Sequence, residues 1–157
     1  MRLAWAAMAC AVFVASLAAH VATFLGIDPM ESFPGVMVLH FLIFPPFVAG
    51  ILLARDKNKN LEADAPAWLG RLVSACFVYA MVNFALFMFR SGASGGPAER
   101  DGKFVMSSHG HIVREITEAE YHQQRAYVVR GFSGHWMLFS SAALLMIVGS
   151  RARPEEA

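Results

Sequence analysis

Four long apolar stretches constrain this chain more than any other feature, because together they carry a single charged residue, Arg71. They cover residues 3–25, 34–54, 68–89 and 131–150. A helix that crosses the hydrocarbon core of a bilayer needs about 20 predominantly apolar residues, and each stretch meets that length. The sequence therefore predicts an all-α integral membrane protein, in which residues 1–157 form one domain built on a four-transmembrane-helix bundle.

The composition supports lipid as the solvent. Hydrophobic residues make up 57% of the chain and charged residues 16%, whereas soluble globular chains average about 45–50% and about 25%. The net charge is +1 and the basic residues are scattered, which argues against a nucleic-acid partner. Cys10 and Cys76 lie inside apolar stretches without the spacing of a disulfide framework or a metal site. The expected partners are the lipid bilayer and other membrane protein subunits.

The charges between the stretches predict an orientation. The connection at residues 55–60 is basic, and Arg151 and Arg153 follow the last stretch, whereas residues 27–33 carry Asp28 and Glu31 but no Lys or Arg. The positive-inside rule then places both termini and the middle loop in the cytoplasm. Short loops and frequent Ala favour a bacterial plasma (inner) membrane.

The first stretch also resembles a signal peptide, with Arg2 before an apolar core and a possible cleavage site at residues 16–18. Retention is favoured because the apolar run continues to Leu25. Either outcome leaves Asp28 on the outer side.

Residues 90–130 form the one sizeable loop, expected on the outer side. Residues 91–97 are rich in Gly and Ser and predict a flexible segment. Residues 103–107 and 112–116 have strand character, and Gly110 between them favours a turn, so a small extracytoplasmic β-hairpin is expected. Thr117 and Glu120 form a capping box, which predicts a helix that begins near Glu118 and extends into the fourth span.

Two features predict how the helices pack. Pro45 and Pro46 interrupt the second span and predict a kink there. Gly131 and Gly134 at the start of the fourth span favour close approach of a neighbouring helix.

Hydrogen-bonding side chains recur at one depth in the four spans. His20, His40, Asn83 and His135 each lie four to six residues inside the outer end of a span, which at 1.5 Å per residue is about 6–9 Å below the outer boundary. Tyr79 lies one turn deeper than Asn83 on the same helix face. Polar groups inside spans are costly, usually face the bundle interior and are candidates for function.

Three interpretations of this polar layer stay open. His20, His40 and His135 are candidate cofactor ligands, two of them for b-type haem or all three for a divalent metal, with Asn83 and Tyr79 in supporting positions. The layer alternatively binds a polar substrate or quinone, or only joins helices by hydrogen bonds. Motifs for phosphate binding, nucleophilic catalysis, zinc proteases and haem attachment are missing from the sequence, so no catalytic residue is predicted.

The favoured functional hypothesis is a small, non-enzymatic accessory or assembly subunit that acts through its outer loop and helix faces. The alternative is a membrane redox or metal-handling protein that uses the histidines near the outer face. A transporter or enzyme is less favoured, because the spans contain no acidic residue for a proton relay.

Overall fold

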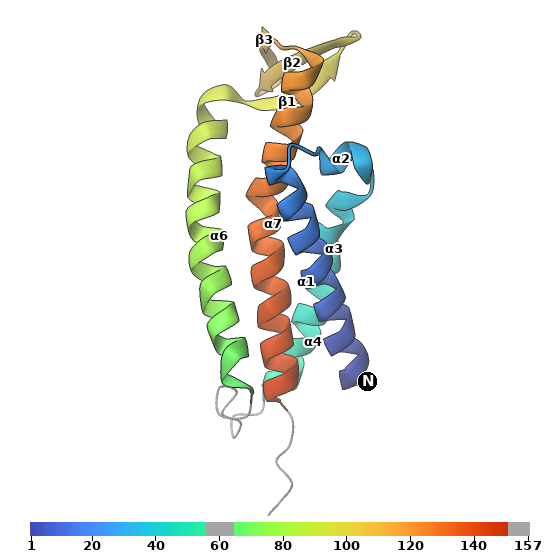
Figure 1. Cartoon of the computed structure of the whole chain (residues 1–157), viewed down its shortest axis with the longest axis vertical. Coiled ribbons are helices and arrows are strands. Elements are labelled where there is room, and N and C mark those ends of the chain that lie inside the picture. The colour runs from blue at the N-terminus through green and yellow to red at the C-terminus, as the bar shows by residue number, and fades with distance from the viewer. Residues whose placement is uncertain (56–64, 151–157) are drawn as a thin grey trace, which may run out of the picture.

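A computed structural model describes residues 1–55 and 65–150 (Figure 1). It contains four helical segments long and apolar enough to cross a membrane. These are α1 (Arg2–Phe24), a broken second segment (Val36–Ala54), α6 (Ala67–Ser94) and α7 (Glu118–Gly149). The four helices predicted from the sequence are therefore present, while the basic residues at 57, 59, 151 and 153 lie outside the described residues.

The second segment is divided into η1 (Val36–Val38), α3 (Leu39–Leu42) and α4 (Phe44–Ala54). The interruption falls at Ile43, two residues before Pro45, and Pro45 and Pro46 lie in the first turn of α4. Proline lacks a backbone N–H and clashes with the preceding turn, so it is tolerated at a helix start but not in the interior. The second segment is therefore divided near the two prolines, while the kink expected there stays a prediction.

Helix α7 forms the centre of the bundle. Helices α1, α4 and α6 each make most of their interhelical contacts with α7, and Figure 1 shows α6 on one side of it and α1 and α4 on the other. Trp136 of α7 is fully buried, in a cluster with Val12, Val36, Ile43 and Val129. The arrangement is therefore three helices packed around a fourth.

The two glycines of α7 allow α6 to approach closely. A Cβ atom added at Gly131 would lie 2.5 Å from Cγ of Phe87, and one added at Gly134 would lie 3.1 Å from Nδ2 of Asn83. The predicted close packing at both glycines is confirmed.

The region between α6 and α7 is a three-stranded antiparallel sheet rather than a two-stranded hairpin. The strands are β1 (Gly96–Arg100), β2 (Lys103–Ser108) and β3 (His111–Glu115), in that order across the sheet. The expected β2–β3 hairpin is present. The prediction of a flexible segment at residues 91–97 was wrong, because α6 continues to Ser94 and β1 begins at Gly96.

Two tight turns organise this sheet. Asp101 and Gly102 join β1 to β2, His109 and Gly110 join β2 to β3, and all four have positive φ. Positive φ at both central residues is the type I′ geometry that matches the twist of paired strands.

The start of α7 follows the capping-box prediction. The Thr117 hydroxyl accepts a hydrogen bond from the backbone N–H of Glu120 at 3.2 Å. From Glu118 the helix runs without interruption to Gly149. The expected helical extension beneath the sheet is confirmed.

Candidate functional site

The polar side chains predicted to share one depth all surround the same two turns of α7. His20 contacts Ser133, Asn83 contacts the carbonyl groups of Arg130 and Gly131, and His40 contacts Trp136. His135 itself lies on this stretch of α7. These side chains therefore form one layer of interhelical contacts centred on α7.

His20 joins three helices. Its Nδ1 lies 2.7 Å from the hydroxyl of Ser133 on α7, and its Nε2 lies 2.5 Å from the hydroxyl of Tyr79 on α6. Ser133 also donates to the Arg130 carbonyl at 3.2 Å. Both contacts of Ser133 form together if its hydroxyl donates to that carbonyl and accepts from Nδ1–H of His20. Nε2 then accepts from Tyr79, so both ring nitrogens of this buried histidine are occupied.

Asn83 fastens α6 to α7 directly. Its Nδ2 donates to the carbonyl oxygen of Arg130 at 2.8 Å and to that of Gly131 at 3.3 Å. These contacts lie beside the close approach at Gly131 and Gly134, where two helix backbones come together. Asn83 and Tyr79 therefore both link α6 to the rest of the bundle.

His40 and His135 occupy aromatic surroundings instead. His40 Nδ1 accepts a hydrogen bond from Nε1–H of Trp136 at 3.1 Å, and its ring lies edge-on to Phe132. The His135 ring lies edge-on to Phe84, with centroids 4.7 Å apart. Its buried Nδ1 lies near the Gly131 carbonyl one turn earlier but makes no hydrogen bond of standard geometry within the described residues.

The three histidines are not brought together as a ligand set. Among the described residues, no hydrogen bond or ring contact joins any two of them. Ligation of haem or metal by His20 would require its bonds to Ser133 and Tyr79 to break. The geometry favours the interpretation of this layer as interhelical hydrogen bonding.

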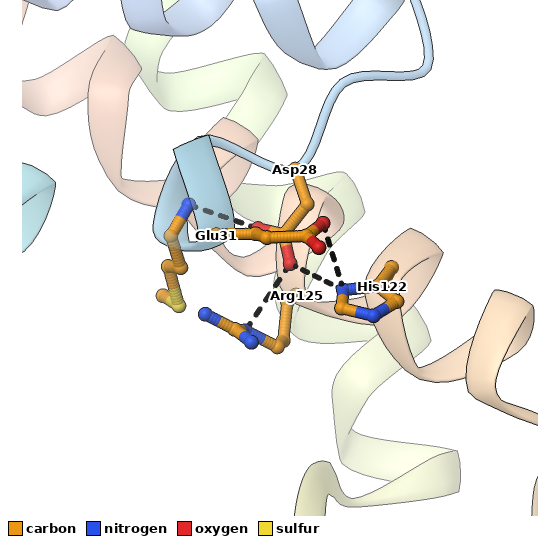
Figure 2. A network of polar contacts seen from close by, with 5 residues as sticks. Asp28, Glu31, His122 and Arg125 are labelled. Atoms are coloured by element: carbon orange, nitrogen blue, oxygen red, sulfur yellow. Dashed lines mark hydrogen bonds and ion pairs between the residues drawn. The ribbon is translucent and has the colours of Figure 1, made fainter. Parts of the chain in front are cut away.

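A second polar cluster lies at the end of the bundle that carries the sheet, and sequence reasoning missed it. Asp28 precedes the short helix α2 (Pro29–Ser32), and its Oδ1 accepts from the N–H of Met30 at 2.9 Å. Figure 2 shows the carboxylates of Asp28 and Glu31 facing His122 and Arg125 of α7. The side chain of Asp28 is only 1% exposed.

The contacts in this cluster centre on one oxygen atom. His122 Nδ1–H donates to Asp28 Oδ2 at 3.0 Å, and Arg125 Nε lies 3.3 Å from the same oxygen. Glu31 Oε2 lies 3.4 Å from His122 Nδ1. A buried carboxylate needs paired charges and hydrogen bonds, and α7 supplies both here. The cluster therefore fastens the first interhelical connection to α7.

The same residues have the composition of a metal site. One potential ligand atom each from Asp28, Glu31 and His122 lies within 4.8 Å of the others. The Arg125 guanidinium already neutralises Asp28 Oδ2, and His122 uses Nδ1 as a donor. Protonated donors and a neighbouring cation disfavour a divalent ion. The geometry fits an interhelical ion-pair network better than a metal centre.

Part of this cluster was visible in the sequence. Asp28 directly before Pro29 is a typical helix start, with a capping side chain followed by proline at the first position. The pairing with His122 spans 94 residues, and no local pattern indicates it.

No family model matches the chain, and neither does any curated protein or solved structure.

Proposed function

We propose that this chain is a multi-pass protein of a bacterial plasma membrane, with its sheet on the outer side and the opposite end of the bundle in the cytoplasm. Large apolar side chains cover the outside of the helices, among them Phe41, Phe77 and Leu86, which are 68%, 53% and 62% exposed. Apolar surface this extensive is unfavourable in water and favourable in lipid. Arg55 follows the last turn of α4, whereas Asp28 precedes α2, and Figure 1 shows α2 at the opposite end of the bundle from that end of α4, in agreement with the positive-inside rule.

Within that membrane, we propose a non-enzymatic accessory or assembly role, in which β3 adds a strand of a partner membrane protein to the outer sheet. The observation that carries this proposal is the free edge of β3. In the strand order β1-β2-β3, β1 packs on α7, whereas β3 is the far edge and every residue in it is exposed. An edge strand presents unpaired N–H and C=O groups that pair with another chain.

The side chains of β3 favour such pairing. Ile112 and Val113 are adjacent and each 54% exposed. Natural edge strands are usually protected by charges or bulges. β3 has a register shift at Val113, between the pairs Met106–Arg114 and Ser107–Ile112, and carries Arg114 and Glu115 at one end, but its apolar pair stays exposed. β-branched residues also favour strand pairing.

The strand is held in place before any partner arrives. Arg114 donates to Glu120 of α7 through Nη1 at 3.1 Å and also through Nη2, and these bonds raise the pKa of its guanidinium. Ile116 N–H donates to the Phe104 carbonyl at 2.9 Å. A strand that is already ordered loses less entropy on binding.

The alternative, a redox or metal-handling role, has less support. His20 and His40 already make hydrogen bonds within the bundle, and the described histidines do not converge on one point. The polar layer fits the closing of a helical bundle in lipid.

A photo-crosslinking amino acid tests the strand proposal in membranes. Placed at residue 112, it should give one adduct of defined mass, whereas placement at residue 99 on β1 should not. Ile112→Lys should remove an adduct formed from residue 113, since a lysine on an edge opposes pairing. Asp101→Asn is the matched control, because it makes the same change in charge and keeps a turn residue that tolerates positive φ. Equal adducts from β1 and β3, or none from β3, would contradict the proposal.

Reporter fusions test the membrane topology separately. A fusion near Gly96 should be active only as an external reporter, and one after Asn60 only as a cytoplasmic reporter. An external signal after Asn60 would reverse the proposed orientation.

A further inference from the structure

A pocket of about 810 Å³ opens at the outer end of the bundle, below the sheet. It is bounded by the end of α1 at Thr23 and Phe24, by Arg90 of α6, and by the outer part of α7 up to Arg130. Binding sites for small ligands usually measure about 300–1,000 Å³. The pocket is therefore large enough for a phosphorylated headgroup.

Two arginines give this pocket an excess of positive charge. Arg130 donates through Nε to the Thr23 hydroxyl at 3.0 Å and through Nη2 to the Thr23 carbonyl at 2.6 Å. Its guanidinium also lies 4.0 Å from the centre of the Phe24 ring. Arg90 lies 4.8 Å from the ring centre of Tyr127. All these partners are uncharged.

The other charged groups around the pocket are already paired. Glu120 binds Arg114, and His122 binds Asp28 and Glu31. Across residues 1–55 and 65–150, neither Arg90 nor Arg130 forms an ion pair with a carboxylate. Two guanidinium groups without acidic partners attract an anion, and a pocket wall strengthens that field.

The hydrogen-bonding capacity left over fits a phosphate. A guanidinium has five N–H groups, and Arg130 commits only two of them to Thr23. Within residues 1–55 and 65–150, the side chain of Arg90 has ring contact but no hydrogen bond. Arginine binds phosphate through paired N–H groups with favourable geometry.

The position of the pocket along the bundle indicates the source of that phosphate. Arg90 directly follows the third apolar stretch and Arg130 directly precedes the fourth, so both lie where lipid headgroups begin. Phe89 and Phe24 beside them are 86% and 60% exposed, so large apolar surface adjoins the two arginines. A phospholipid can therefore place its phosphate against the two arginines and its acyl chains against the exposed phenylalanines at the same time.

We propose that this pocket binds the phosphate of an anionic phospholipid, held between Arg90 and Arg130. The proposal rests on insertion in the membrane as proposed above, but not on the partner strand at β3. Loss of lipid binding would leave the crosslinks from β3 unchanged, so the two proposals fail separately.

Native mass spectrometry of the detergent-purified full chain, titrated with phosphatidylglycerol, measures the binding. The expected result is weakening of about tenfold or more in Arg90→Gln and Arg130→Gln together, and of about threefold or more in Arg90→Gln alone. Arg71→Gln at the other end of α6 is the matched control and should bind as the unmodified chain does. Phosphatidylcholine, whose phosphate is neutralised within the headgroup, should bind about tenfold more weakly.

The single variant at Arg90 keeps the test valid if loss of Arg130 disturbs the end of α1, because Arg90 makes no hydrogen bond to that helix among the described residues. Equal weakening by Arg71→Gln, or no weakening by Arg90→Gln, would overturn the proposal. Protection of the chain from thermal unfolding by inorganic phosphate as effectively as by phosphatidylglycerol would also overturn it, in favour of a soluble phosphate ligand.

Discussion

Helices α6 and α7 lie side by side and have similar lengths, 28 and 32 residues, but 50% of the apolar stretch of α7 is buried against 11% for α6. The buried helix is the less apolar of the two. It contributes Gly131, Ser133, Gly134, Ser140 and Ser141 to the interior. In water the most apolar helix would be buried, so this arrangement agrees with the proposed membrane location, because in lipid close packing and hydrogen bonds decide which helix is central.

The serines of α7 show how this helix contains polar groups without destabilising the core. Ser140 and Ser141 donate to carbonyls three or four residues earlier, at 2.6 Å to Trp136 and 2.9 Å to Leu138. Ser133 reaches another helix through His20, and Ser141 lies within hydrogen-bonding reach of Cys76 on α6. These serines therefore combine small size, which allows close packing, with polar groups that are satisfied inside the bundle.

Among the variants that test this difference between α6 and α7, Gly131→Ala is expected to change the free energy of unfolding most. The new Cβ would overlap the Phe87 ring and force α6 away from α7, so the free energy of unfolding should fall by about 3 kcal/mol. Reversible unfolding in mixed micelles measures it. Gly70→Ala on α6 is the control, since its Cβ meets no atom within 4 Å and alanine favours the helix. Equal losses in both variants would contradict the idea that the close approach of α6 to α7 at Gly131 stabilises the bundle.

A smaller loss is expected at the outer end of α7 from Asp28→Ala. This change leaves His122 and Arg125 without their buried acceptor and removes the cap on α2, which should lower the free energy of unfolding by about 2 kcal/mol. Glu31→Ala is the control, because its side chain is 63% exposed and its contact with His122 is longer. Should Glu31→Ala be the more damaging, the buried carboxylate would not be the centre of the network.

His20→Phe tests whether hydrogen bonding or shape holds α1 and α6 at the polar layer. Phenylalanine fills similar space but leaves Ser133 and Tyr79 without their partner, so a loss of about 1.5 kcal/mol is expected. Tyr79→Phe removes one of the two bonds and should cost about 0.6 kcal/mol. If the purified protein also loses a Soret band or bound metal in His20→Phe, the structural interpretation of this histidine is wrong.

The smallest change in the free energy of unfolding is expected from a substitution on the exposed face of α6, which points away from α7. Val82→Ala shortens a side chain that is 56% exposed and should change the free energy of unfolding by less than about 0.5 kcal/mol. Ala80→Val, on the buried face of the same helix, should be clearly more damaging because Ala80 is 0% exposed. Similar effects at residues 80 and 82 would mean that the face of α6 that carries Val82 is covered by another protein chain.

Local patterns predicted most of the fold. Helix existence follows from the length of each apolar stretch, and the start of α7 follows from Thr117 and Glu120 within one turn. The missed strand β1 was also locally encoded, because Asp101-Gly102 is a favoured pair for a type I′ turn. A flexible segment was predicted at residues 91–97, and no prediction was drawn from that pair.

The sequence by itself determined four apolar helices, the interruption near Pro45 and the cap at Thr117, and it placed His20, His40, Asn83 and His135 at similar distances from the ends of their helices, since each depends on residues within a few turns of one another. Only the tertiary structure decided that α7 is central, that His20 pairs with Ser133 and Tyr79, and that Asp28 meets His122. Those contacts join residues 59 to 113 positions apart. Hydropathy contains no information on them, because every apolar face is equally acceptable to lipid and only complementary shape and hydrogen bonding select the neighbour.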